Sequence, residues 1–265
     1  MNNFHHHCLT IIQVNDPSAK CQLTTELAAK FNSGWEFDFS PSSIISIPHP
    51  GRPEKPELVS PLAVPKRTLG SRAGHAGLIH SLAHIEFNAL NLALDACYRF
   101  QALPREFYAN WLEVAAEEAY HFSLLTQHLV SLGSSYGAVV AHNGLWDMVL
   151  RTEHDPLVRM ALVPRVLEAR GIDAIPVIQA KLHKIHDSAG VAILHIIHDD
   201  EIKHVTYGDN WFKYFCKQRD LEPEATFFQL LQQYNAPRIR GAFNRAGRIQ
   251  AGFSPHELDQ LSSGA

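Results

Sequence analysis

Two short stretches, Glu118-Ala119-Tyr120-His121 and Glu201-Ile202-Lys203-His204, decide the fold that this sequence predicts. Each has the spacing Glu-x-x-His, and they lie 201−118 = 83 positions apart. A lone glutamate precedes each quartet: Glu86 comes 118−86 = 32 positions before the first and Glu168 comes 201−168 = 33 positions before the second. The matched offsets indicate two helical hairpins that carry the same residue pattern and are related by a pseudo-twofold axis.

The residue types in this pattern are those of a metal site. Side chains three positions apart lie on one helical face, so each quartet directs a carboxylate and an imidazole to the same place. Imidazole suits iron, copper, zinc and nickel better than magnesium or calcium, and carboxylates can bridge two cations. One Glu from each of two helices and a Glu-x-x-His from each of two others hold two metal ions inside a four-helix bundle. We therefore predict two iron ions, with Mn or an Fe/Mn pair as alternatives, held by Glu86, Glu118, His121, Glu168, Glu201 and His204.

The predicted ligands lie on apolar helical faces. Leu194, Ile197 and Trp211 share a face with the second quartet, and Trp111 and Leu125 share one with the first. Burying an unpaired carboxylate costs several kcal/mol or forces it to take a proton. A single Glu-x-x-His is more often a surface pair, but two of them with two spaced glutamates on apolar faces favour a dinuclear site.

Composition limits the classes of protein that this chain can be. Its 265 residues include 23 basic and 27 acidic ones, and a net charge of −4 gives no nucleic-acid or membrane signature. The four cysteines form no Cys-x-x-Cys pair, which predicts a reducing compartment and no cysteine-built metal site. The start lacks the features of a signal peptide, and no apolar run reaches about 18 residues. We expect a cytoplasmic protein with no membrane or nucleic-acid partner.

The sequence predicts an all-α chain with three parts in one structural domain. Residues 1–70 contain an N-terminal helix from Pro17 to about Asn32 and an extended strap with seven prolines between Pro41 and Pro65. Residues 71–220 form the four-helix bundle, and residues 221–265 a C-terminal helix and a basic tail. Bundle helices are expected over 71–100, 104–132, from 155 onward, and 187–217. Pro164 and Pro176 should kink the third of these close to Glu168.

The ligand pattern resembles that of the ferritin-like di-iron carboxylate superfamily. More specifically, Leu167-Glu168-Ala169-Arg170-Gly171, the Asp200-Glu201-x-x-His204 quartet, and Arg240-Gly241-Ala242-Phe243-Asn244 with Ala251-Gly252-Phe253 resemble the DUF455 family, ferritin-like proteins of unknown function. The resemblance runs from the proline-rich strap to the end of the chain. It implies a ferritin-like four-helix bundle around a dinuclear site.

Four further residues are candidates for supporting the metals. The quartets are similar to those of O2-activating di-iron enzymes, in which an acid just before Glu-x-x-His supports a ligand histidine. Glu117 and Asp200 hold this place, with a solvent-facing acid as the alternative, especially for Glu117. His198 and Tyr207 lie one turn before Glu201 and one turn after His204. The functional interpretation is an extra metal ligand for His198 and a redox role for Tyr207. Ordinary structural roles are the more frequent alternative for both residues.

Histidines and arginines near the two ends suggest weaker sites. His5-His6-His7 would chelate metal adventitiously if it belongs to a flexible tail. Arg238, Arg240, Arg245 and Arg248 fall within eleven residues and are candidates for binding an anionic substrate group. Pairing of these arginines with surface acids is an equally good interpretation.

The leading hypothesis for function is an oxidoreductase that activates O2 or peroxide and oxidises or hydroxylates a small molecule, with an unidentified electron donor. The alternative is an iron-binding or peroxide-detoxifying protein, similar to ferritin or rubrerythrin, without an organic substrate. Two histidines and the absence of a Cys-x-x-Cys module favour the first. The sequence leaves the substrate and the oligomeric state open, with a homodimer as one possibility.

Overall fold

The structure is a computed structural model that describes residues 2–65, 69–236 and 243–263. Within these ranges the regular elements are helices, and the extended chain contributes two isolated β-bridges but no strand, as an all-α fold requires. The chain forms two compact units, Met1–Leu150 and Arg151–Ala265. The predicted division into residues 1–70, 71–220 and 221–265 stays a prediction.

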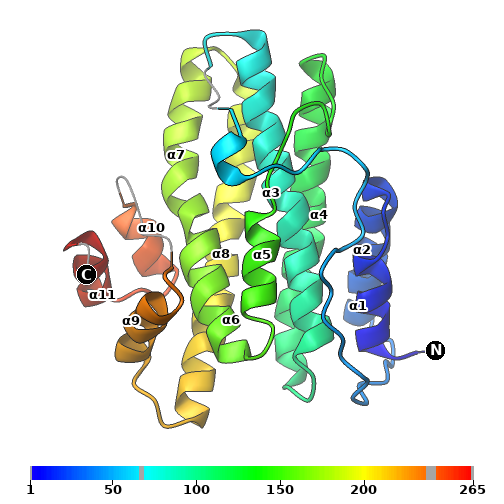
Figure 1. Cartoon of the computed structure of the whole chain (residues 1–265), viewed down its shortest axis with the longest axis vertical. Coiled ribbons are helices and arrows are strands. Elements are labelled where there is room, and N and C mark those ends of the chain that lie inside the picture. The colour runs from blue at the N-terminus through cyan, green and yellow to red at the C-terminus, as the bar shows by residue number, and fades with distance from the viewer. Residues whose placement is uncertain (1, 66–68, 237–242, 264–265) are drawn as a thin grey trace. The chain divides into compact units, whose positions relative to one another are not determined.

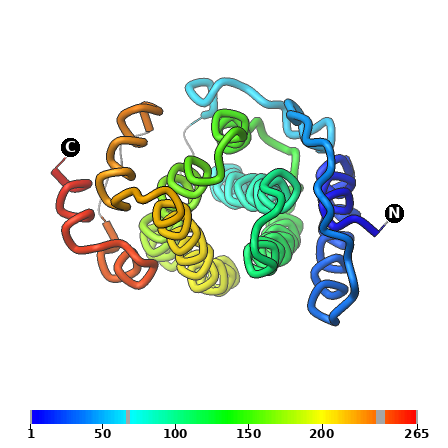
Figure 2. Tube along the Cα trace, turned by 90° about the horizontal axis from the view of Figure 1, so that it is seen from below, coloured from blue at the N-terminus to red at the C-terminus, as the bar shows by residue number. Residues whose placement is uncertain are grey.

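Unit 1 is built on the helical hairpin of α3 (Arg72–Arg99) and α4 (Arg105–Ser131), which lie side by side in Figures 1 and 2. Helix α1 (Phe4–Ile12) packs on α3, and α2 (Pro17–Asn32) packs on α4. Helix α5 (Gly144–Arg151) comes at the end of the unit. The bounds of α2, α3 and α4 confirm the predicted helices to within one or two residues.

Side-chain caps explain where these helices begin. The Asp16 carboxylate accepts a hydrogen bond from the Ala19 amide at 2.7 Å, with Pro17 at the first helical position. Asn3 caps α1 in the same way by accepting from the His6 amide. The flexible-tail interpretation of the three histidines was wrong, because they belong to α1 and His5 is fully buried.

The proline-rich segment between α2 and α3 is a strap along unit 1, as predicted. Its described residues include one short 3-10 turn, Pro61–Ala63. The Gly51 amide donates to the Ile12 carbonyl at 2.8 Å, and Leu58 forms a parallel bridge with Ala141. These contacts attach the strap at two separate places.

Unit 2 is built on the hairpin of α7 (Ala169–Lys184) and α8 (Ser188–Gln218), also side by side in both views. Helix α6 (Pro156–Leu162) leads through a π-helical segment, η2 (Val163–Glu168), into α7. The predicted break near Glu168 is confirmed at Pro164, where the π-helical segment lies, whereas Pro176 is accommodated inside α7 without ending it. Proline removes a backbone donor and clashes with the preceding turn, so Pro164 disfavours the regular α-helical pattern there.

The C-terminal part contains more helix than expected. The predicted helix after α8 is α9 (Pro223–Gln233), and the expected basic tail also contains α10 (Arg245–Gln250) and α11 (Pro255–Ser263). All four cysteines are free and buried. Among the helices that the structure describes, none is long and apolar enough to cross a membrane.

Candidate metal centre

Unit 1 brings together three of the predicted ligands. Glu86 projects from α3, and Glu118 and His121 project from α4. One ligand atom from each lies within 4.8 Å of the other two, and all three residues are buried. His121 Nδ1 is 3.2 Å from a Glu86 oxygen and 3.5 Å from a Glu118 oxygen. The spacing Glu-x-x-His with a glutamate 32 positions earlier therefore produces a compact three-ligand cluster.

The surroundings of this cluster are apolar. Trp111, Ala115 and Leu125 lie on the inward face of α4 and are completely buried. Such walls keep bulk water away from the carboxylates and strengthen every electrostatic interaction among them.

The electrostatics of the cluster fit a cation. Burial, and then the charge of Glu118, raise the pKa of Glu86 well above its usual value, while the hydrogen bond with His121 opposes that rise. Two carboxylates and one imidazole in a buried space form a mixed oxygen and nitrogen donor set, which suits a divalent transition-metal ion. A bound cation would let both carboxylates stay ionised.

Unit 2 buries the corresponding three residues. Glu168 is the last residue of η2, and Glu201 and His204 lie on α8. Their exposed fractions are 7%, 6% and 0%. A Cβ added at Gly171, in the first turn of α7, would lie 3.1 Å from the carboxylate carbon of Glu201. The glycine therefore lets the Glu201 carboxylate approach the backbone of α7.

The four candidate supporting residues are less deeply buried than the six predicted metal ligands. Glu117 and Tyr207 are half-buried. Asp200 lies 3.5 Å from the Lys203 ammonium, and its side chain is 24% exposed. His198 Nδ1 lies 3.9 Å from the exposed Asp199 carboxylate. Their predicted support of the metal ligands stays a prediction.

The described arginines of the C-terminal region pair with acids. Arg248 is fully buried, and its guanidinium lies 2.7 Å from an Asp173 oxygen. Arg245 lies 2.9 Å from Asp259. These contacts agree with the pairing interpretation for Arg245 and Arg248, and the anion-binding role stays a prediction. Arg238 and Arg240 lie outside the described residues.

A buried ionic cluster beside Glu168 was not predicted. Arg165, in η2, is completely buried and lies 3.1 Å from Asp209, and it also pairs with Glu257 of α11. Its guanidinium carbon is 4.0 Å from the centre of the Phe227 ring. Arg165 lies three positions before Glu168 in the same segment, so this cluster fixes the segment that presents the glutamate. Its partners are far apart in sequence, and the one local signal is an arginine within an apolar run.

Comparison with known proteins gives a family. A protein of Haemophilus influenzae described as "Uncharacterized protein" is 44% identical over 263 residues, covering 95% of this chain and 91% of its own length. No solved structure matches the chain. Residues 13–259 match the family described as "Protein of unknown function (DUF455)". A match over nearly the whole chain means that this protein belongs to the DUF455 family.

Proposed function

We propose that this protein is a di-iron or Fe/Mn carboxylate oxidoreductase that activates O2 or peroxide to oxidise or hydroxylate a small molecule. The observation that carries the proposal is the convergence of Glu86, Glu118 and His121 in a buried, apolar place. Desolvated carboxylates close to one another are costly unless a cation or protons compensate them. Their residue types suit iron and manganese, which can change oxidation state.

The second ligand set supports two metals rather than one. Unit 2 repeats the same residue types at nearly the same offsets and buries all three, Glu168, Glu201 and His204. We propose that the two sets are the halves of one dinuclear centre in a ferritin-like four-helix bundle. This arrangement uses a Glu from each of two helices and a Glu-x-x-His from each of two others.

The chain's own residues would perform three tasks in such a centre. The four glutamates would balance the charge of two cations, and the two histidines would complete the ligand set. The apolar walls of α3 and α4 would exclude water. A bound pair of redox-active ions supplies the electrons that O2 or peroxide chemistry needs, and an external donor would return them.

Metal content tests the ligand assignment. Protein purified without added metal should contain about two redox-active ions per chain, and Glu118→Gln should lower this content substantially. Glu113→Gln is the matched control, because Glu113 lies on the same helix and is exposed. Equal metal content in both variants and the wild type would show that the ligands have been assigned wrongly.

The dinuclear claim needs a measurement of its own. Paired ions in such sites are about 3.5–4 Å apart, which allows magnetic coupling through bridging carboxylates. Mössbauer and electron paramagnetic resonance spectra of iron-loaded protein should show a coupled pair. Two uncoupled mononuclear signals would overturn the dinuclear centre while leaving each ligand set as a metal site.

Iron retention separates oxidation of a substrate from storage. With excess Fe(II) in air, an oxidoreductase should consume O2 and retain about two irons per chain, because a bundle centre has no mineral-holding shell. Retention of many tens of irons per chain would favour the storage alternative.

A further inference from the structure

Two histidines lie close together at the end of the α3–α4 hairpin that is away from its connecting turn. His75 belongs to the first turn of α3 and His128 to the last turn of α4. A nitrogen of one imidazole lies within 4.8 Å of a nitrogen of the other, and the two ring centres are 6.1 Å apart. His128 is buried and His75 is half-buried, so the pair stays within reach of solvent on the side of His75.

The pair is separate from the Glu86–Glu118–His121 cluster. His75 precedes Glu86 by 86−75 = 11 positions, and His128 follows His121 by 128−121 = 7, so each histidine shares a helical face with a predicted ligand. At 1.5 Å per residue these intervals are about 16 Å along α3 and about 10 Å along α4. The completely buried Leu125 lies between His121 and His128. An ion held by the histidine pair would therefore not belong to the first ligand set.

The Ser131 hydroxyl fixes the tautomer of His128. Its one hydrogen is donated to the His128 carbonyl oxygen, at 2.7 Å. The same hydroxyl oxygen lies 3.2 Å from His128 Nδ1, so the imidazole is the donor in this second contact and Nδ1 carries its proton. Neutral His128 then has its lone pair at Nε2. A metal-ligating histidine usually has its other ring N–H fixed by such a partner.

The helix ends that carry the pair are joined by the protein itself. The Arg72 Nε–H donates to the Leu132 carbonyl at 3.0 Å, which ties the start of α3 to the residue after α4. The Ser71 hydroxyl caps α3 by accepting from the Gly74 amide at 3.1 Å, one residue before His75. Arg72 is exposed, so solvent screens its charge. Because the two backbones are already held together, little ordering remains to be done when a ligand binds.

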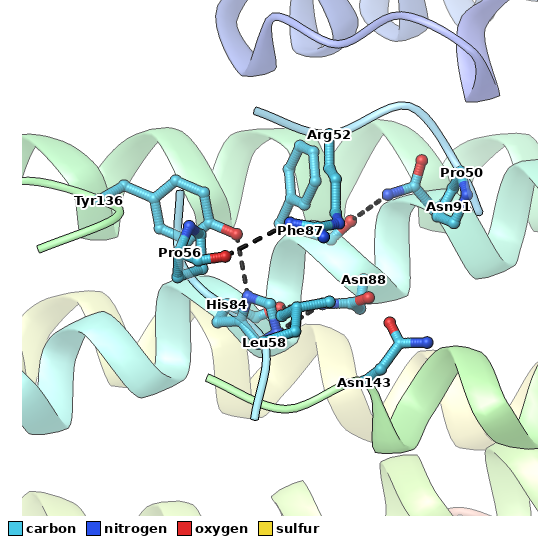
Figure 3. Close-up of a pocket in the computed structure, with 10 residues that line it drawn as sticks. All are labelled: Pro50, Arg52, Pro56, Leu58, His84, Phe87, Asn88, Asn91, Tyr136 and Asn143. Carbon is cyan, nitrogen blue, oxygen red and sulfur yellow. Dashed lines mark hydrogen bonds between the residues drawn. The ribbon is translucent and has the colours of Figure 1, made fainter. Parts of the chain in front are cut away.

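Another histidine of α3 shows the opposite arrangement. His84 Nδ1 lies 2.9 Å from the Tyr136 hydroxyl, as Figure 3 shows, and its Nε2 lies 3.0 Å from the His142 carbonyl. This carbonyl can only accept, so Nε2 carries the proton and Nδ1 accepts from Tyr136. Both ring nitrogens of His84 serve protein groups, which makes it a structural histidine. The tautomer of His128 instead leaves a nitrogen with the lone pair that a metal ion needs.

We propose that His75 and His128 together bind one divalent transition-metal ion, such as Zn(II), outside the proposed di-metal centre. Neutral imidazole suits zinc, copper and nickel. Zinc–nitrogen bonds are about 2.0–2.1 Å long, so one ion spans at most about 4.2 Å between two nitrogens. A small rotation of the half-buried His75 side chain brings the two nitrogens within this span. Water completes the coordination from the solvent side, and the ion joins the first turn of α3 to the last turn of α4.

Calorimetric titration of the full-length protein, as purified, with Zn(II) tests the proposal. We expect a site of one zinc per chain that His75→Gln and His128→Gln each weaken by about tenfold or more. His49→Gln is the matched control, because it removes an exposed histidine of the strap and should leave this site unchanged. The double variant should lose little more affinity than either single variant, since loss of one ligand already breaks the shared site. Additive losses would show two independent sites and would overturn the proposal.

Two further measurements keep the result decisive even if a variant fails to fold. Anomalous scattering at the zinc edge, from wild-type crystals soaked in Zn(II), should place an ion about 2.0–2.1 Å from a nitrogen of both His75 and His128. Glu118→Gln should bind zinc at this pair like the wild type, so the pair can succeed or fail independently of the proposed centre. Zinc found only at other residues, or an affinity unchanged in both single variants, would overturn the proposal.

Discussion

Replacing Gly208 with alanine should disturb the segment that carries Glu168. Gly208 lies inside α8, and a Cβ there would come within 2.1 Å of Pro164 Cβ and 2.5 Å of Pro164 Cγ. Non-bonded carbons normally approach to about 3.5–4.0 Å. The proline ring cannot rotate away, because it is closed onto the backbone at the start of η2. The added methyl group must therefore move η2 and α8 apart.

The size of the effect follows from two opposing terms. Alanine inside a helix is favoured over glycine by about 1 kcal/mol, whereas overpacking a close contact costs about 1–3 kcal/mol and occasionally more. The overlap with Pro164 puts Gly208→Ala at the upper end, so we expect a net loss of about 1–2 kcal/mol in the free energy of unfolding. For a chain of this size that corresponds to a fall in melting temperature of roughly 2–8 °C.

Chemical unfolding in urea, with and without metal, measures this loss. Pro164→Gly removes the two ring atoms that Gly208→Ala would strike, so the double variant should recover part of the stability in a double-mutant cycle. Metal content should fall in Gly208→Ala, because η2 ends at Glu168. A single variant as stable as the wild type would refute the reasoning, and so would a cycle without coupling.

Three other results are expected. Gly171→Ala should lower metal content with little loss of stability. The added Cβ would lie 3.1 Å from the Glu201 carboxylate carbon, so this carboxylate must shift by a few tenths of an ångström. Unchanged metal content would contradict this expectation. Chelation should lower the melting temperature and Fe(II) or Mn(II) should restore it, since metal binds the folded state preferentially; a melting temperature indifferent to chelators would contradict the proposed centre. Burial lowers the pKa of Lys20 from 10.5 to about 7, so the unfolded chain binds the proton more tightly and stability should rise with pH between about 7 and 10.5. The rise is at most about 1.4 kcal/mol per pH unit, and comparison of the wild type with Lys20→Met by urea unfolding across this range should show it in the wild type alone.

Local signals were sufficient for the long helices. Capping residues such as Asp16 and Ser71, together with apolar spacing, located α2 and α3, and Pro164 located the break before Glu168. The short helices α1, α10 and α11 were missed because six to nine residues carry too little local preference to form a stable helix alone. Tertiary contacts such as the burial of Phe4 and His5 make α1 a helix.

In the candidate site, too, local sequence patterns predict some residues, and others depend on tertiary packing. Residue spacing predicted which side chains converge in unit 1, because Glu118 and His121 share a helical face and α3 lies beside α4. The attachment of the strap could not be predicted, since it joins Gly51 to Ile12 and Leu58 to Ala141, 51−12 = 39 and 141−58 = 83 positions apart. Arg165 likewise pairs with Glu257, 92 positions later. Such contacts depend on packing that no local pattern specifies.

The two ligand sets are alike in residue type but not in how the chain presents them. Glu86 lies within the uninterrupted helix α3, whose regular hydrogen bonds fix its position. Glu168 ends a π-helical segment in which Pro164 cannot donate a backbone hydrogen bond, and such segments are rare and frequent at functional sites. Its position therefore depends on contacts from outside the segment. The Arg165 ion pairs hold one side of η2, and the contact of Pro164 with Gly208 holds another. Mutations remote from Glu168 in sequence should consequently reach the second ligand set, whereas the first should respond mainly to changes within α3 and α4.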